Sequence, residues 1–162
     1  MVAKLFNIVQ PERAYFGQKD IQQTIVLKAL VRDLHIPIEL RVGRTVREYD
    51  GLALSSRNAY LDPSRRSDAL ILYRALKAGI DFYGSHATAS ATAILQAALD
   101  SLTTEIDRSD GRVSVEYLNI VHPQNLKLLT DADSGKGGIL VGAIRLKGAE
   151  RTIRLIDNLI LE

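Results

Sequence analysis

Hydrophobic residues in the first 45 positions switch between helical and strand spacing. Apolar positions repeating at three and four residues predict helices, and apolar positions alternating with polar ones predict strands. In chain order, the spacing predicts the end of a helix over 1–10, a short strand over 13–16, a helix over 20–34 and a strand over 38–42. Pro11 stops the first helix and Gly17 breaks the first strand. Strand, helix and strand in this order predict one βαβ unit, with parallel pairing and a right-handed crossover.

The pattern changes near residue 47. Residues 44–60 are irregular and polar, which is typical of a long loop or linker. Asp62-Pro63 then predicts a helix start, with Asp as the cap and Pro at the first position, and Gly84 closes this helix after about Phe82. A second helix over 88–106 and three strands, over 113–121, 138–146 and 152–161, follow. We therefore predict an α/β unit over 1–46 and an α+β domain over 47–162, in which two helices cover a small antiparallel sheet.

The composition is that of an ordinary globular protein. Of the 162 residues, 46% are hydrophobic and 25% are charged, and no apolar run approaches the roughly 20 residues needed to span a bilayer. Residues 1–7 lack the features of a secretory signal, and the absence of cysteine excludes disulfides and thiol catalysis, so we expect a cytoplasmic protein. The net charge is +2, and residues 1–49 hold eight Lys/Arg against five Asp/Glu. This local excess favours an anionic small ligand over nucleic acid.

The first polar cluster, residues 16–23, lies where the first predicted strand gives way to a helix. In an open α/β sheet this junction is the ligand-binding edge. Gly17 allows a sharp turn and close approach of a ligand, the first N–H groups of the helix have no partners within it, and Lys19 adds a mobile positive charge. Gln23 falls in the first helical turn and can point toward the same ligand. The structural alternative is that Asp20 caps the helix and that Lys19 and Gln23 are surface residues.

The second polar cluster, residues 50–58, lies in the long loop. Ser55-Ser56-Arg57 supplies two hydroxyl groups and a planar guanidinium, and Gly51 precedes them. These donors can grip a polyphosphate and neutralise charge that develops on it. The structural alternative is a Ser-rich loop with a surface arginine. Arg47-Glu48, just before the cluster, is consistent with a simple exposed ion pair.

Other polar patterns carry less chemistry. His35, His86 and His122 are far apart and have no companions at ligand spacing, so we expect no metal site. No G-x-S-x-G nucleophile elbow occurs, and we assign no catalytic residue. Residues 134–138, Ser-Gly-Lys-Gly-Gly, hint at a phosphate loop, but the earlier glycine of that motif is absent. A hairpin loop is therefore the favoured interpretation.

Together, several segments closely resemble the pantothenate synthetase (pantoate–beta-alanine ligase) family. The two specific ones are Phe-Gly-x-Lys-Asp-x-Gln-Gln, over 16–23, and Asp-Gly-Leu-Ala-x-Ser-Ser-Arg-Asn, over 50–58. Residues 4–9, Arg47-Glu48 and the closing strand residues 154–158 also match, so the resemblance spans the chain.

The resemblance implies a two-step reaction. Pantoate attacks the α-phosphate of ATP to give pantoyl adenylate and pyrophosphate, with Mg²⁺ assisting, and the amine of beta-alanine then displaces AMP. The family's ATP-contacting loop matches Gly17, Gln18, Lys19 and Asp20, and its pantoate-binding glutamine matches Gln23. A position whose backbone meets the adenine matches Val46, and the mobile loop that closes on the phosphates matches Leu54, Ser55, Ser56 and Arg57.

The chain also departs from the family pattern. The family's first nucleotide motif, with Met-Pro and paired histidines, and a second pantoate-binding glutamine belong upstream and are missing, and Arg44 stands where proline is usual. The chain therefore resembles the end of a Rossmann-like nucleotide-binding domain, over 1–46, plus the whole C-terminal lid domain, over 47–162. We expect this fragment to be inactive alone.

Two other functions stay open. The chain could be part of a related nucleotidyl transferase acting on a different acid, or an isolated C-terminal domain with only a binding or assembly role. The family usually dimerises through its nucleotide-binding domain, and some members are fused to a cytidylate kinase. The resemblance leaves the oligomeric state and such a fusion undecided for this chain.

Overall fold

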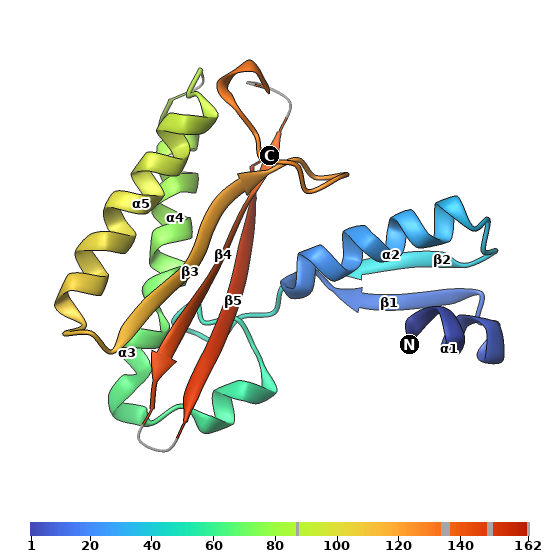
Figure 1. Ribbon diagram of the computed structural model, residues 1–162, viewed down its shortest axis with the longest axis horizontal. Coiled ribbons are helices and arrows are strands. Elements are labelled where there is room, and N and C mark those ends of the chain that lie inside the picture. Colours follow the sequence, from blue (N-terminus) through green and yellow to red (C-terminus); the bar gives the residue numbers. More distant parts are fainter. Residues whose placement is uncertain (87, 134–136, 149–150, 162) are drawn as a thin grey trace. The chain divides into compact units, whose positions relative to one another are not determined.

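The computed structural model describes residues 1–86, 88–133, 137–148 and 151–161. The chain divides into two compact units, Met1–Thr45 and Val46–Glu162. Figure 1 shows the elements of each unit along the chain. No helix in the described part of the chain is long and apolar enough to span a membrane.

The first unit is the predicted βαβ arrangement preceded by a helix. Its elements are α1 (Val2–Val9), β1 (Arg13–Gly17), a short 3₁₀ helix η1 (Gln18–Asp20), α2 (Ile21–Asp33) and β2 (Glu39–Gly43). β1 and β2 pair in parallel, in a register running from Arg13 opposite Glu39 to Gly17 opposite Gly43. The parallel pairing predicted from the sequence is confirmed. The buried hydrophobic side chains of this unit are Phe6, Ile25, Leu27 and Ile38.

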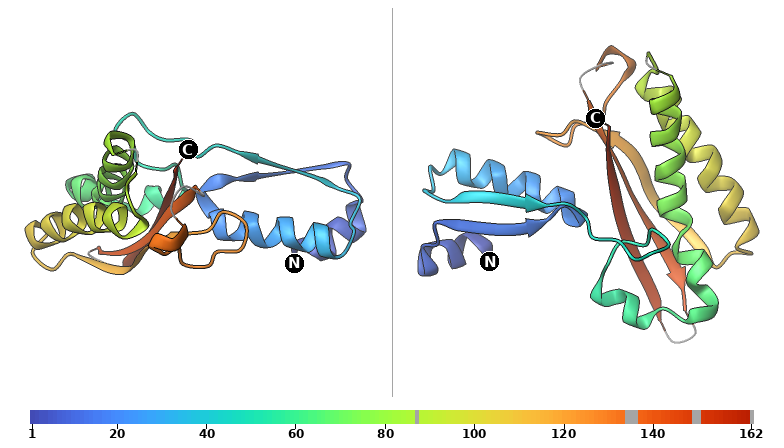
Figure 2. Two further views of the ribbon diagram at one scale, coloured as in Figure 1. Left: turned by 90° about the horizontal axis from the view of Figure 1, so that it is seen from above. Right: turned by 180° about the vertical axis from the view of Figure 1, so that it is seen from behind.

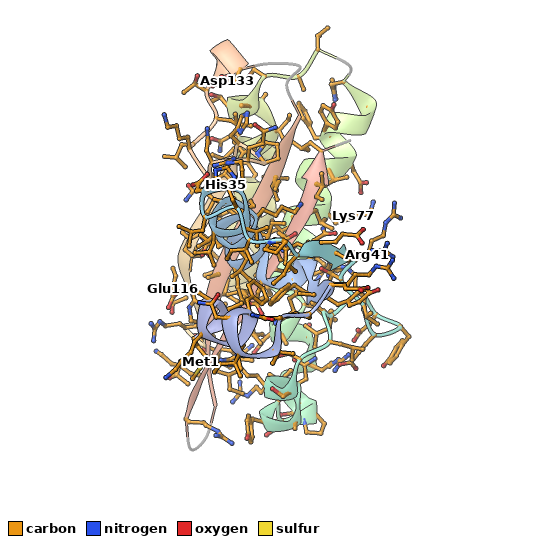
Figure 3. All side chains as sticks on the ribbon, turned by 90° about the vertical axis from the view of Figure 1, so that its right-hand side faces the viewer. Met1, His35, Arg41, Lys77, Glu116 and Asp133 are labelled. Carbon is orange, nitrogen blue, oxygen red and sulfur yellow. The ribbon has the colours of Figure 1, made fainter. Side chains whose placement is uncertain are left out.

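The ends of the first-unit elements follow local chemistry. Gln10 adopts a left-handed conformation with φ of 48° and donates its N–H to the carbonyl of Phe6, which ends α1 just before Pro11 as predicted. Ile38 lies outside β2, because the strand begins only at Glu39. Arg41 extends from β2 to solvent and pairs with Glu39 at 2.9 Å (Figure 3).

The second unit is an α+β layer, as predicted. Its helical elements are η2 (Ser56–Tyr60), η3 (Pro63–Arg65), α3 (Arg66–Ala69), α4 (Ile71–Ser85), α5 (Ala91–Arg108) and η4 (Asp131–Asp133). Its strands are β3 (Val113–Val121), β4 (Gly138–Lys147) and β5 (Thr152–Leu161). The strands form an antiparallel sheet in the order β3-β4-β5, and α4 and α5 cover one face of it (Figure 2). The core lies between this face and the two helices, and Ile71, Leu76, Leu102, Leu140 and Ile144 are almost completely buried in it.

The helices of the second unit differ from the predictions in three places. The helix expected from 62 to 82 is divided into η3, α3 and α4, although Asp62 caps its start by accepting a hydrogen bond from the N–H of Ser64 at 2.8 Å. Gly84 does not end α4, which continues to Ser85. The second helix begins at Ala91 rather than 88, because the Ser90 hydroxyl accepts the N–H of Ala93 and caps it there.

An ion-pair cluster crosses the exposed face of this sheet. The register of β3 against β4 shifts between Val115 and Tyr117, and Glu116 lies at this irregularity. Its carboxylate pairs with Arg154 of β5 at 2.6 Å and with Arg145 of β4 at 2.5 Å. The hydrogen bond from Arg154 and the charges of both arginines hold the pKa of Glu116 below its usual range. This cluster therefore ties the three strands together on a surface that the helices do not cover.

Candidate functional site: two polar clusters

The first polar cluster begins at the carboxyl end of β1. Gly17 has an ordinary extended backbone, with φ of −85° and ψ of 136°, so the sharp turn expected from the sequence is not present. A Cβ placed on Gly17 would meet no atom of the protein within 4 Å. The fold of this unit therefore gives no steric reason for glycine here, and the open space beside it is accessible to a molecule from outside.

The residues after Gly17 form η1 and the first turn of α2. Asp20 occupies the N-cap position of α2, but its side chain makes no capping hydrogen bond. The structural alternative for Asp20, that it serves as a side-chain cap, is therefore wrong. Gln18 and Lys19 are half-buried and interact with other groups of the chain, whereas Gln23 is exposed in the first turn of α2.

The second polar cluster starts with a tight reversal of the chain. Arg47 and Ala53 form an antiparallel bridge, the N–H of Leu54 donates to the carbonyl of Val46 at 2.9 Å, and the N–H of Gly51 donates to the carbonyl of Glu48 at 2.9 Å. The side chain of Val46 is exposed, and its carbonyl is already used within the chain. These bonds form the base from which the segment Leu54–Arg57 emerges.

Gly51 has a structural reason to be glycine. Its φ is +99°, a conformation that L side chains rarely adopt, and a Cβ at this position would come within 2.0 Å of the Tyr73 ring of α4. The sequence suggested that this glycine served a ligand-binding loop, whereas the structure shows that it lets the turn pack against Tyr73.

Two ion-pair systems hold this turn in place. The expectation of an exposed ion pair between Arg47 and Glu48 is wrong. Arg47 instead pairs with Asp157 of β5 at 2.6 and 3.0 Å, donates to the carbonyl of Gly51 at 2.9 Å, and lies over the ring of Tyr73 at 4.6 Å from its centroid. Asp157 is buried, with only 5% of its side chain exposed. A buried carboxylate requires a partner of opposite charge, which Arg47 supplies.

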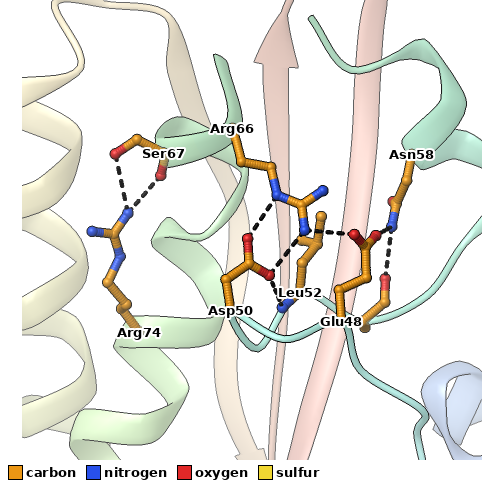
Figure 4. Close-up of polar contacts among 8 residues, drawn as sticks. Glu48, Asp50, Leu52, Asn58, Arg66, Ser67 and Arg74 are labelled. Carbon is orange, nitrogen blue, oxygen red and sulfur yellow. Dashed lines mark hydrogen bonds and ion pairs between the residues drawn. The ribbon is translucent and has the colours of Figure 1, made fainter. Parts of the chain in front are cut away.

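The second system joins Arg66 of α3 to both carboxylates of the turn (Figure 4). Arg66 donates through Nε to Asp50 at 2.7 Å and through Nη2 to Glu48 at 2.7 Å. Glu48 also accepts a hydrogen bond from the Asn58 amide at 2.9 Å. Arg66 lowers the pKa of Asp50, and Arg66 followed by Asn58 lowers the pKa of Glu48, while the pKa of Arg66 is raised mainly by Asp50. Both carboxylates are therefore negative at neutral pH, and their ion pairs with Arg66 stabilise the turn.

The predicted phosphate-gripping segment, Leu54–Arg57, lies on the surface. Leu54, Ser56 and Arg57 are exposed, and Ser55 is half-buried with its hydroxyl accepting the N–H of Arg57 at 3.2 Å. Among the residues that the structure describes, no ion pair or hydrogen bond from the guanidinium of Arg57 is found. The segment therefore presents the Arg57 guanidinium and the Ser56 hydroxyl, for which no partner is found in the described part of its own unit.

The sequence interpretation included Asn58 in the second polar cluster but missed Arg66 and Asp157, which hold the turn in place. A signal existed for Asp157, because Asp157-Asn158 interrupts the otherwise apolar stretch from Leu155 to Leu161, and polar residues buried in a sheet require partners. His35 lies at the end of α2 (Figure 3), and no three His, Cys, Asp or Glu side chains within the described ranges gather closely enough to hold a metal ion. The candidate phosphate loop over 134–138 falls mostly outside the described residues.

Comparison with known proteins places the chain in one family. The family model described as pantoate-beta-alanine ligase matches residues 1–160. A pantothenate synthetase from Chloroflexus aggregans is 44% identical over 161 residues, which are 99% of this chain and 54% of that protein. A bifunctional pantoate ligase/cytidylate kinase from a Synechococcus strain is 44% identical over 99% of this chain and 28% of its own length. The chain therefore belongs to the pantoate–beta-alanine ligase family.

Solved structures agree with this placement. The crystal structure of pantothenate synthetase from Thermus thermophilus matches with a TM-score of 0.79 and 45% identity, over 99% of this chain and 53% of that one. The Francisella tularensis ligase, complexed with beta-gamma ATP and beta-alanine, matches with a TM-score of 0.63 and 25% identity, over 99% of this chain and 48% of that one. The chain thus spans about half the length of the single-function relatives that it matches.

Proposed function

We propose that this chain supplies ATP-binding and pantoate-binding residues of a ligase that condenses pantoate with beta-alanine. In this reaction the pantoate carboxylate attacks the α-phosphorus of ATP and pyrophosphate leaves. The amine of beta-alanine then attacks the acyl carbon of the adenylate, an amide bond forms and AMP departs. Both steps develop charge on phosphate oxygens, so cationic and N–H donors held in position are the main requirement.

The observation that carries the proposal is the exposed segment Leu54–Arg57. No partner of the Arg57 guanidinium is found within the described part of the chain, while the side chains of the nearby Arg47 and Arg66 are fully engaged. An unpaired guanidinium beside two hydroxyl groups is suited to bind phosphate oxygens through charge-assisted hydrogen bonds.

The second part of the proposal concerns the first unit, Met1–Thr45. The open space beside Gly17 at the carboxyl end of β1 is where ligands bind in open α/β sheets. We assign Gly17, Gln18, Lys19 and Asp20 to ATP, and Gln23 to pantoate. Val46 is assigned to the adenine through its backbone.

The remaining assignments belong to the same proposal. Residues 1–46 are the end of a Rossmann-like nucleotide-binding domain, and residues 47–162 are the lid domain. Mg²⁺ enters as its complex with ATP, since phosphate oxygens supply the ligands that it prefers. We place the protein in the cytoplasm, and the homodimer is the assembly that we expect of full-length members of the family.

We expect the chain to bind ATP. We expect it not to complete the reaction alone, because it spans only about half the length of the pantothenate synthetases that it matches. Robust release of AMP that depends on both pantoate and beta-alanine would overturn this expectation. A non-catalytic binding or assembly role is the remaining candidate, and the half-length match is the observation that favours it.

Calorimetric titration with MgATP and with pantoyl adenylate tests the proposal. Arg57→Ala and Lys19→Ala should each weaken binding about tenfold, the effect of losing one charge-assisted hydrogen bond. Matched controls are Arg108→Ala and Lys28→Ala, exposed cations on α5 and α2 that should leave binding unchanged. Absence of binding at millimolar ligand, or equal effects in the variants and their controls, would refute the assignment.

A further inference from the structure

The side chain of Asn58 joins the two ends of the exposed segment Leu54–Arg57. We call these two ends, Ala53 and Asn58, the neck of the segment. Its side-chain amide nitrogen donates to the carbonyl of Ala53 at 3.1 Å and to Oε1 of Glu48 at 2.9 Å. Ala53 and Asn58 are the residues immediately before and after Leu54–Arg57, so the first of these bonds spans the base of a four-residue loop. The backbone N–H of Asn58 also donates to the carbonyl of Ser55 at 2.9 Å.

The orientation of the Asn58 amide is fixed by its surroundings. Both neighbours are acceptors, so only the NH₂ group can face them. The amide oxygen, Oδ1, is buried and has no hydrogen-bond partner among the described residues. Leaving a buried acceptor unpaired is unfavourable, and the amide holds this orientation because turning it over would lose both hydrogen bonds and place oxygen against oxygen.

The neck is attached to a helix through an ion pair. The other carboxylate oxygen of Glu48, Oε2, accepts from Arg66 at 2.7 Å, and Arg66 is also held by Asp50 (Figure 4). The chain of contacts therefore runs from α3 through Arg66 and Glu48 to the Asn58 amide, and ends at the backbone of Ala53. Each charged group in this chain has a partner, which makes the arrangement stiff.

We propose that Asn58 is a positioning residue, which orders Leu54–Arg57 before a ligand arrives. This inference rests on the proposed function of the segment in phosphate binding. A loop that is already ordered loses less conformational entropy when it binds, so closing the neck increases affinity without any contact between Asn58 and the ligand. The hydrogen-bond polarity of residue 58, rather than its size, is what this role requires.

The test compares three variants with a matched control. Asn58→Ala removes both side-chain hydrogen bonds, and Asn58→Asp keeps the shape but sets a carboxylate against Glu48 and the Ala53 carbonyl. The double variant Asn58→Asp with Glu48→Gln restores one donor–acceptor pair, because the glutamine amide can donate to residue 58 while its oxygen accepts from Arg66. Asn125→Ala is the control, since the Asn125 side chain also bonds the nearby backbone, by accepting the N–H of Lys127, but lies in the loop after β3.

Two measurements are made on each variant. Amide hydrogen exchange of residues 54–58 by NMR needs no ligand, and MgATP affinity by calorimetry reports the functional effect. We expect exchange of these amides to accelerate about tenfold in Asn58→Ala and more in Asn58→Asp, with MgATP affinity falling in the same order. The double variant should recover part of both losses relative to Asn58→Asp, and the control should match the unaltered chain.

The outcomes separate the two proposals. Unchanged exchange in both single variants overturns the inference, and so does accelerated exchange with unchanged affinity, because the residue would then be structural only. If the unaltered chain binds no MgATP, the proposed function fails and the positioning role fails with it, although the exchange data still show whether Asn58 orders the loop. If Asn58→Asp does not fold, the decision rests on Asn58→Ala, and equal values for it and Asn125→Ala count against the inference.

Discussion

Three glycine-to-alanine substitutions separate glycines that the fold requires from glycines that it does not. At Gly51 the added methyl group meets two obstacles. The φ of +99° costs an L residue about 1–2 kcal/mol, and the new Cβ lies 2.0 Å from the nearest atom of the Tyr73 ring. Since ordinary contact begins near 3.4 Å, the ring must move by more than an ångström. Overpacking of this kind costs about 1–3 kcal/mol, so we expect a total loss of about 2–5 kcal/mol.

Gly84 provides the opposite case. It lies in the last turn of α4, and a Cβ there would meet no atom within 4 Å. Gly84→Ala should therefore stabilise the second unit by up to about 1 kcal/mol, because alanine favours the helix and restricts the unfolded chain. Gly17→Ala should leave stability within about 0.5 kcal/mol but weaken MgATP binding, since only a ligand would fill the space beside it.

Urea denaturation followed by circular dichroism measures these changes, and the double variant Gly51→Ala with Tyr73→Ala separates the two costs. Removing the ring should recover the steric part of the Gly51→Ala loss and leave the backbone part, giving a favourable coupling of about 1 kcal/mol or more. A Gly51→Ala variant within about 0.5 kcal/mol of the parent, or one no less stable than Gly84→Ala, would refute the reasoning.

Three further changes test the ion pairs and caps. Asp62→Ala should cost about 1 kcal/mol in urea denaturation, because the helix start loses its side-chain cap, and a change below about 0.3 kcal/mol would contradict that role. Asp157→Asn should cost about 3 kcal/mol, since it leaves a largely buried guanidinium without its carboxylate; equal stability would show that the pair contributes nothing. The folded-state pKa values of Glu48 and Asp50 are lowered, so their stabilisation is present above their unfolded-state pKa values and is lost as the pH falls from roughly 4.5 downward. Urea midpoints between about pH 6 and pH 3 should fall less steeply in Arg66→Met than in the parent, and identical slopes would rule this linkage out.

Much of the fold could be predicted from the sequence because it depends on local patterns. Apolar periodicity identified the parallel pairing of β1 with β2, and the Asp62-Pro63 pair marked a helix start that the structure confirms. Gly84 misled the prediction, because a glycine near the end of a helix favours termination only if the chain there adopts a left-handed conformation. α4 instead continues one residue further, to Ser85, and its C-cap residue His86 has φ of −134°.

The site was harder to predict because its scaffold is made by distant residues. The two arginines that stabilise the second cluster, Arg47 and Arg66, pair with carboxylates 110 and 16 positions away, and sequence spacing carries no information on such contacts. The sequence identified both clusters, but it could not tell the residues that hold the turn, such as Gly51 and Asp50, from those that remain available to a ligand, such as Arg57. That distinction needs the hydrogen-bond partners.

The small core of the first unit has a thermodynamic consequence. Within Met1–Thr45, all of which the structure describes, four hydrophobic side chains are buried around a two-stranded parallel sheet. A two-stranded sheet is marginally stable in water without further packing, so this unit should melt in a separate step, below the second unit. Any ligand that binds only the folded form of this unit then increases its free energy of unfolding, by about 2.7 kcal/mol when the free ligand concentration is a hundred times Kd. The midpoint of that lower step therefore rises. Thermal denaturation therefore detects ligands that bind at the carboxyl end of β1 and the start of α2.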